Sequence, residues 1–195
     1  MSKILTYLNP IGISFFNSHN IDFDRHPLND WDISFMQSTL LFAKHSKCAA
    51  HKVGCSFVKN NTIISIGING TISGTTNCNN IYKKINNQWY KNKNNKDDDC
   101  FYICSDQEEH HKWSLKHEIH AEINAIGKAV RSGISLNDSI LYSTHSPCFD
   151  CAKALSVSGV KKILILNEYD NSEEVAEFLS EAGIFIYKIP SYLIE

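Results

Sequence analysis

Two short stretches contain the residue types that bind metal ions in proteins. His120 and Glu122 form an H-x-E group, and Cys148 and Cys151 form a C-x-x-C group directly after Pro147. Cysteines at positions i and i+3 share one helix face, so both sulfur atoms can reach one ion. Proline suits the first helical turn, and the helix N-terminus favours thiolates. One nitrogen and two sulfur ligands leave zinc a fourth position for water, which is typical of a catalytic site.

The chemistry that this set supports is hydrolysis. Zinc lowers the pKa of a bound water to about 7, and a carboxylate that is not a ligand can take its proton and return it to a leaving group. H-x-E…P-C-x-x-C is the signature of zinc nucleobase deaminases. We therefore predict that His120, Cys148 and Cys151 bind zinc and that Glu122 transfers protons. Helix positions i and i+2 diverge, so His120 and Glu122 can serve one site only off the N-terminal end of their helix.

Other interpretations of these residues are weaker. The H-E-x-x-H motif of zinc proteases needs histidines at i and i+4, whereas His117 and His120 are three residues apart. A lone C-x-x-C also fits a redox pair or two buried thiols, and a lone histidine is often a hydrogen-bonded core residue. The metal interpretation depends on all four residues together.

Composition excludes several classes of protein. The chain has 195 residues, 43% hydrophobic content and a net charge of −2, which suit one globular domain and give no basic excess for nucleic acid. We therefore expect no stable nucleic-acid partner. The sequence has no apolar run long enough for a membrane span, so we expect no membrane partner, and we expect no signal peptide. Seven cysteines without export predict reduced thiols in the cytoplasm, or in the host cytoplasm if the chain is viral.

Hydrophobic periodicity predicts an irregular N-terminal arm over 1–30 and then a catalytic domain over 31–195. The expected elements are a helix over 31–45, strands over 53–59 and 62–68, a helix over 118–131, a strand over 139–145, a helix over 148–159, a strand over 161–169, a helix over 172–183 and a strand over 184–189. Residues 70–116 are rich in Asn and Lys, and we expect a long loop or an insertion, the latter at about 75–115. Alternating strands and helices predict an α/β protein with a sheet that is parallel in its C-terminal half.

Longer stretches resemble the deoxycytidylate (dCMP) deaminases of the cytidine deaminase superfamily, in particular the phage-type enzymes. They are SKCAAHKVGC (46–55), GINGTISG (67–74), WSLKHEIHAEINAI (113–126) and THSPCFDCAKALSVSGVKKILILNEYD (144–170). The resemblance covers roughly 31–188. It implies a three-layer α/β/α fold around a mixed sheet of about five strands. The implied activity is zinc-dependent hydrolysis of dCMP to dUMP and ammonia, which supplies dUMP for thymidylate synthesis.

The resemblance also implies functional residues beyond the catalytic zinc site. A second, structural zinc would be bound by Cys48, Cys78, His110 and Glu118; His111, His117, Cys100 and Cys104 are alternative ligands. Tyr169 and Asn69 match residues that contact the nucleotide. Arg131 matches a residue linked to regulation by dCTP and dTTP, effectors that would bring Mg²⁺. Ile68 and Ile72 depart from the tyrosine and proline of the family motif, which puts that regulation in doubt. Related enzymes are mostly hexamers, so we expect a homo-oligomer.

Three alternatives differ in function. The chain could act on another cytosine nucleotide, since the sequence does not fix the phosphate number. It could deaminate a tRNA base, although its acidic balance and Ser146 before Pro147 disfavour this. It could be an inactive scaffold held together by zinc, although such a protein has no use for Glu122.

Overall fold

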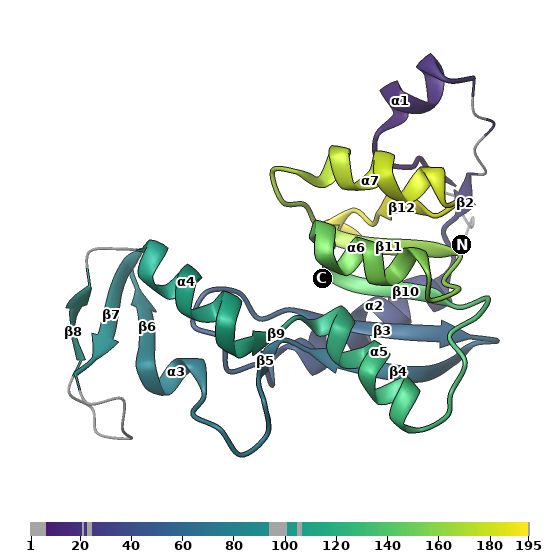
Figure 1. Ribbon diagram of the computed structural model, residues 1–195. Coiled ribbons are helices and arrows are strands. Elements are labelled where there is room, and N and C mark those ends of the chain that lie inside the picture. Colours follow the sequence, from purple (N-terminus) through teal and green to yellow (C-terminus); the bar gives the residue numbers. More distant parts are fainter. Residues whose placement is uncertain (1–6, 21, 23–24, 94–100, 105–106, 195) are drawn as a thin grey trace.

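The computed structural model describes residues 7–20, 22, 25–93, 101–104 and 107–194, and a mixed five-stranded sheet forms its centre (Figure 1). The strands are β3 (Gly54–Lys59), β4 (Thr62–Ile68), β10 (Ile140–His145), β11 (Lys162–Asn167) and β12 (Phe185–Lys188), in the order β12-β11-β10-β3-β4. β10, β11 and β12 are parallel, and β3 is antiparallel to both β10 and β4. The predicted mixed sheet with a parallel C-terminal half is confirmed.

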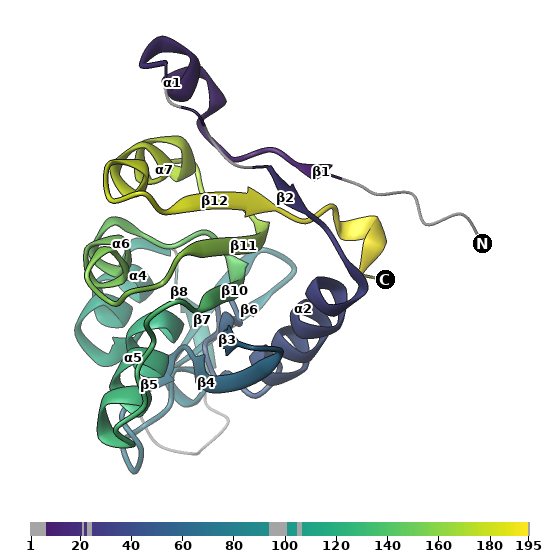
Figure 2. The same cartoon turned by 90° about the vertical axis from the view of Figure 1, so that its right-hand side faces the viewer.

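Helices cover both faces of this sheet (Figure 2). α2 (Asp30–Ala43) packs on one face, and α5 (Ala121–Arg131), α6 (Phe149–Ser156) and α7 (Ser172–Glu181) pack on the other. Strand alternation divides the core accordingly: Leu141 belongs to the cluster under α5–α7, and its neighbour Tyr142 belongs to the cluster under α2. These three layers confirm the predicted fold class. No helix in the described ranges has the length and apolarity to cross a membrane.

Local sequence explains the first hairpin and the start of α2. Asn60 and Asn61 join β3 to β4 with φ angles of 51° and 54°, which a two-residue hairpin turn requires and which asparagine tolerates. Asn29 caps α2 by accepting a hydrogen bond from the Asp32 backbone N–H at 3.2 Å, and Asp32 accepts one from the Asn29 backbone N–H at 2.9 Å. This capping box sets where the helix begins.

The N-terminal arm has more structure than the predicted irregular segment. β1 (Tyr7–Leu8) pairs with β2 (His26–Pro27), and α1 (Ile13–Ser18) lies between them. The Ile11 backbone N–H donates to the Ile186 carbonyl oxygen at 2.7 Å, so the arm covers the outer edge of β12. Two-residue strands carry no detectable period, which is why the sequence did not reveal them.

The prediction of a long loop over 70–116 is wrong, whereas the alternative, an insertion at about 75–115, stays a prediction. This segment contains β5 (Gly70–Thr71), α3 (Cys78–Ile81), β6 (Tyr82–Ile85), β7 (Gln88–Asn92), β8 (Phe101–Cys104) and α4 (Gln107–His117), followed by β9 (Glu118–Ile119). β6, β7 and β8 form an antiparallel sheet that projects from one end of the molecule (Figure 1). Its small core includes Tyr82 and Trp89, packed against Cys48 and Cys78.

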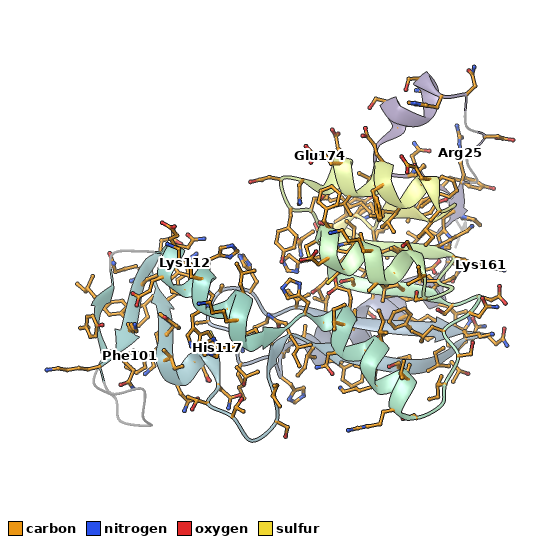
Figure 3. All side chains as sticks on the ribbon, viewed as in Figure 1. Arg25, Phe101, Lys112, His117, Lys161 and Glu174 are labelled. Atoms are coloured by element: carbon orange, nitrogen blue, oxygen red, sulfur yellow. The ribbon has the colours of Figure 1, made fainter. Side chains whose placement is uncertain are left out.

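Hydrophobic side chains on the exposed face of this sheet hid it from the periodicity analysis. Ile85, Tyr102 and Ile103 are exposed, so the alternation between buried and polar positions is broken. Figure 3 shows Lys112 of α4 and Phe101 of β8 on the same projecting part. Asn86 and Asn87 form the β6–β7 turn with positive φ, as Asn60 and Asn61 do in the first hairpin. That repeated Asn-Asn signal was the available clue.

Candidate functional site

The N-termini of α5 and α6 bring the first metal-binding set together. His120 is the N-cap of α5, and Cys148 is the N-cap of α6. The His120 Nδ1 atom lies 3.3 Å from Cys148 Sγ and 3.4 Å from Cys151 Sγ. Ligand atoms that lie about 2.0–2.3 Å from one tetrahedral zinc ion are separated from one another by similar distances. The predicted placement off the helix N-terminus is confirmed, because α5 begins at Ala121 and not at the expected residue 118.

The two sulfur atoms of this set shift each other's pKa in opposite directions. A hydrogen bond from Cys151, opposed by burial and aided by His120, lowers the pKa of Cys148 to about 4. The same bond to Cys148, together with burial, raises the pKa of Cys151. A divalent cation would displace the remaining thiol proton, because both thiols must be deprotonated to bind metal.

Glu122 lies beside the metal-binding set, in the first turn of α5. Its side chain is only 4% exposed, and its Oε2 atom is 3.4 Å from Cys151 Sγ. Burial raises the pKa of Glu122. A carboxylate shifted toward neutral pH can both accept and donate a proton, as general acid–base catalysis requires.

A second group of ligand atoms assembles from distant parts of the chain. Cys48 Sγ lies 3.3 Å from Glu118 Oε2, and Cys78 Sγ lies 3.3 Å from His110 Nε2. All four ligand atoms lie within 4.8 Å of one another. The resemblance implied these four residues, and each comes from a different place in the fold. Cys48 follows α2, Cys78 begins α3, His110 lies within α4 and Glu118 begins β9.

The chemistry of this second group fits a bound cation. Glu118 Oε1 is buried and has no hydrogen-bond partner within the described part of the chain, while Oε2 accepts from Ser114 Oγ at 2.5 Å. An unsatisfied buried carboxylate oxygen is costly, and a metal ion would satisfy it. A hydrogen bond from Cys78 lowers the pKa of Cys48 to about 3, which favours a thiolate. Four protein ligands would close the coordination sphere, which is typical of a structural zinc site.

The alternative ligands are placed less favourably. His117 stacks on Trp113 with ring centroids 4.6 Å apart, and its Nδ1 lies 2.7 Å from the Trp113 carbonyl oxygen. His111 lies on the pocket wall. Cys100 lies outside the described residues, as does the side chain of Cys104.

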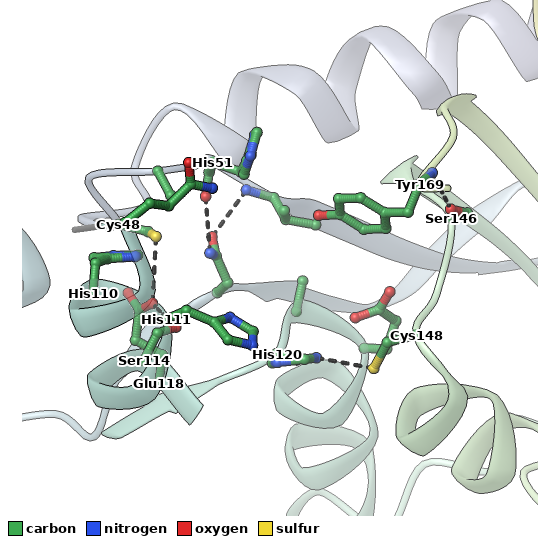
Figure 4. A pocket seen from close by; sticks show the side chains of 16 residues that line it. Cys48, His51, His110, His111, Ser114, Glu118, His120, Ser146, Cys148 and Tyr169 are labelled. Atoms are coloured by element: carbon green, nitrogen blue, oxygen red, sulfur yellow. Dashed lines mark hydrogen bonds between the residues drawn. The ribbon is translucent and has the colours of Figure 1, made fainter. Parts of the chain in front are cut away.

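A cavity of about 340 Å³ lies between the two groups of ligand atoms (Figure 4). Asn69 lines it and fixes one wall: its Oδ1 accepts from the Val53 N–H at 2.9 Å and from Ser46 Oγ at 2.6 Å. Its Nδ2 donates to the His51 carbonyl oxygen at 2.9 Å. The amide of Asn69 therefore holds the 46–53 segment at the pocket.

Tyr169 also lines the cavity, together with Ser146. Its ring stacks on His145 with centroids 5.3 Å apart and an interplanar angle of 25°. Burial raises the pKa of Tyr169 to about 12, so its hydroxyl stays neutral at physiological pH. His51 packs edge-on against both rings. No sequence pattern indicated this cluster of three rings, because the residues are far apart along the chain.

Arg131 lies away from the pocket. It is the last residue of α5, whereas His120 precedes the first, so the helix separates them by about 15 Å. The structure therefore does not bring Arg131 to the site, and its predicted regulatory role remains a prediction.

A three-ligand set with an adjacent buried carboxylate is the arrangement of a metal-dependent hydrolase. Residues 29–167 match the family model for the cytidine and deoxycytidylate deaminase zinc-binding region, and the chain belongs to this family.

Phage proteins are among its relatives. The deoxycytidylate deaminase of Enterobacteria phage T2 is 39% identical over 171 residues, covering 80% of this chain and 90% of that protein. The deoxycytidylate deaminase of Enterobacteria phage T4 is 37% identical over 171 residues, covering 80% of this chain and 88% of that protein. The crystal structure of dCMP deaminase from cyanophage S-TIM5 in complex with dCMP and dUMP superposes with a TM-score of 0.61. It has 30% sequence identity and covers 84% of this chain and 100% of that one.

Proposed function

We propose that this protein is a zinc-dependent deaminase that hydrolyses dCMP to dUMP and ammonia and so supplies dUMP for thymidylate synthesis. The phage relatives carry this activity in their names, and the similar cyanophage structure holds dCMP and dUMP. The observation that supports it most directly is the convergence of His120, Cys148 and Cys151 beside the buried Glu122 at one pocket.

The residues of this pocket have different roles in the proposed reaction. His120, Cys148 and Cys151 would hold the zinc ion, which when bound supplies a water of lowered pKa for addition to C4 of cytosine. Glu122 accepts a proton from this water and delivers it to N3 of the ring. Glu122 then passes the second proton of the same water to the departing amine, so water and dCMP yield dUMP and ammonia.

The second zinc would be structural. Cys48, Cys78, His110 and Glu118 would bind it, and it would join the segment after α2 to α3, α4 and β9. The orphaned Glu118 oxygen supports this assignment. The ion would thereby anchor the projecting sheet beside the pocket.

Tyr169 and Asn69 would contact the nucleotide. The neutral Tyr169 hydroxyl offers both a donor and an acceptor at the pocket wall. Asn69 uses one amide N–H on the His51 carbonyl oxygen, and the second N–H is the group through which it would meet a nucleotide.

The resemblance supports three further proposals. dCTP and dTTP would regulate the enzyme with Mg²⁺ and with Arg131, although Ile68 and Ile72 alter the neighbouring motif. The chain would assemble as a homo-oligomer, a hexamer by analogy. Its compartment would be the cytoplasm, that of the host if the source is a phage.

An ammonia-release assay with dCMP, CMP, dCTP and deoxycytidine tests the activity and its specificity. We expect dCMP to be the preferred substrate. Glu122→Ala should lower kcat by about 10²–10⁴-fold while the zinc content stays unchanged. Glu174→Ala, at an exposed position of α7, serves as the control and should retain full activity. Full activity in Glu122→Ala would exclude this mechanism, and zinc binding without turnover of any nucleotide would favour a scaffold.

A further inference from the structure

The pocket presents an electrostatic problem for the proposed substrate, whose phosphate is an anion. Glu118 and Glu122 contribute carboxylates to its wall, and Cys48 and Cys148 contribute sulfur atoms. Even with two zinc ions bound, thiolates and carboxylates leave this wall acidic. Among the described residues that line the cavity there is no lysine or arginine. Phosphate binding must therefore rely on other donor groups.

Two histidines of the pocket wall lie outside both groups of ligand atoms. His51 comes from the 46–53 segment and His111 from α4. In Figure 4, His51 and Tyr169 lie above the hollow, and His111 and His120 lie below it. A histidine side chain donates an N–H in the neutral form and two in the charged form. Either residue could therefore donate to a phosphate oxygen without a lysine or arginine.

His51 is the better placed of the two histidines, because its backbone and its ring are both held. Asn69 accepts from the Val53 N–H and donates to the His51 carbonyl oxygen, both at 2.9 Å, so the backbone around His51 is fixed. The His51 ring centroid lies 5.7 Å from that of His145 and 6.3 Å from that of Tyr169, with interplanar angles of 61° and 81°. The ring nevertheless belongs to an exposed residue at the pocket. This side chain is thus oriented in advance and still open to a ligand.

We propose that His51 donates a hydrogen bond to the 5′-phosphate of the nucleotide, with the Tyr169 hydroxyl beside it, and so makes the pocket select nucleotides over nucleosides. This proposal rests on the proposed function. Hydrogen bonds from imidazole to a phosphate oxygen are charge-assisted and stronger than neutral ones. The base would then point toward Glu122 and the catalytic metal set, at the other end of the same cavity.

Binding of the product and its nucleoside separates the phosphate contribution from the rest. Calorimetry on the zinc-loaded protein would compare dUMP with deoxyuridine in the wild type and in His51→Phe, which keeps a ring but has no N–H donor. We expect His51→Phe to lose about tenfold or more in dUMP affinity while deoxyuridine affinity is unchanged. In steady-state assays the KM for dCMP should rise and kcat should stay near the wild-type value.

Matched variants isolate the role of the imidazole N–H. His145→Phe keeps a ring against Tyr169 and should retain the preference for dUMP, as should His111→Phe. An unchanged preference in His51→Phe, with zinc content also unchanged, would overturn the proposal. Loss of the preference only in His111→Phe would overturn it as well and would place the phosphate beside α4. A wild type that neither binds dUMP nor deaminates dCMP would instead overturn the proposed function itself, and this inference with it.

Discussion

A Cβ atom placed on Gly67 would lie 1.9 Å from the carbonyl oxygen of Ala121, so β4 and the first turn of α5 touch backbone to backbone. Ala121 lies between His120 and Glu122 in the chain. The same contact therefore sets the position of a proposed metal ligand and of the proposed proton carrier relative to the sheet.

Gly67→Ala should damage both folding and activity. The added methyl group would overlap the Ala121 carbonyl oxygen and also approach the Ala125 nitrogen to 2.7 Å, so helix and strand must separate. We expect a loss of about 2–4 kcal/mol in the free energy of unfolding and a fall in kcat, measured by denaturant titration and ammonia release.

Gly127→Ala is the matched control within the same helix. A Cβ at Gly127 would have no neighbour within 4 Å, and alanine favours a helix interior over glycine by about 0.5–1 kcal/mol. This variant should be slightly more stable and fully active. Equal behaviour of the two variants would contradict the proposed close contact.

Cys78→Ser should remove one zinc ion per chain and leave the other in place. Cys78 belongs to the second group of ligand atoms, so its loss should lower Tm by about 5–10 °C through the projecting sheet. Cys55→Ala is the comparison, because Cys55 is fully buried but lies in neither group. Zinc measured by mass spectrometry should fall only in Cys78→Ser. Retention of two ions in that variant would argue against the assignment.

Asp32 should make stability depend on pH in the acid range. Its Oδ2 lies 3.1 Å from His26 Nε2, and its Oδ1 accepts from the Tyr142 hydroxyl at 2.6 Å. Burial acts to raise the pKa of Asp32, but these bonds and the Asn29 N–H outweigh it, and the pKa is lowered. The ionised Asp32 therefore stabilises the fold fully above about pH 4, the ordinary pKa that it has in the unfolded chain. This stabilisation is lost as the pH falls through the lower pKa that Asp32 has in the folded protein.

The Asp32→Asn variant tests this pH dependence directly. It should be less stable than the wild type by about 2–3 kcal/mol at pH 7, and the difference should shrink below about pH 4. Acid also weakens metal binding in both proteins, and this effect cancels when the free energy of unfolding of the variant is subtracted from that of the wild type. Unfolding followed by circular dichroism across pH 3–7 provides the measurement, and a pH-independent difference would show that the charge of Asp32 is not responsible.

Tyr169→Phe should raise the KM for dCMP several-fold with little change in kcat. The hydroxyl is lost, whereas the ring remains available to stack on His145. Because the pKa of Tyr169 is raised to about 12, the effect should be constant between pH 6 and 9. Steady-state kinetics at three pH values measures it, and Tyr169→Ala should be worse because it also removes the stack. Wild-type KM in Tyr169→Phe would show that the hydroxyl does not bind substrate.

Local sequence was sufficient for the elements that carry the first metal set. His120 and Glu122, like Cys148 and Cys151, are separated by two or three residues, so a helix start alone fixes their relation. The alternation of strands and helices after residue 118 likewise predicted the parallel part of the sheet. The observed element boundaries differ from the predicted ones by a few residues. The most important difference is at α5, which begins at Ala121 and therefore makes His120 its N-cap.

Ligand types and short spacings are local properties of the chain, so the type of chemistry could be predicted from the sequence alone. The contact of the Glu118 carboxylate with the Cys48 thiol, 70 residues apart, and the packing of His51 beside Tyr169 arise only in the folded chain. The same is true of the Asn-rich segment, which folds into β6, β7 and β8. Such contacts depend on packing between distant segments, whose free energy is spread over many side chains and leaves no periodic signal in any one of them.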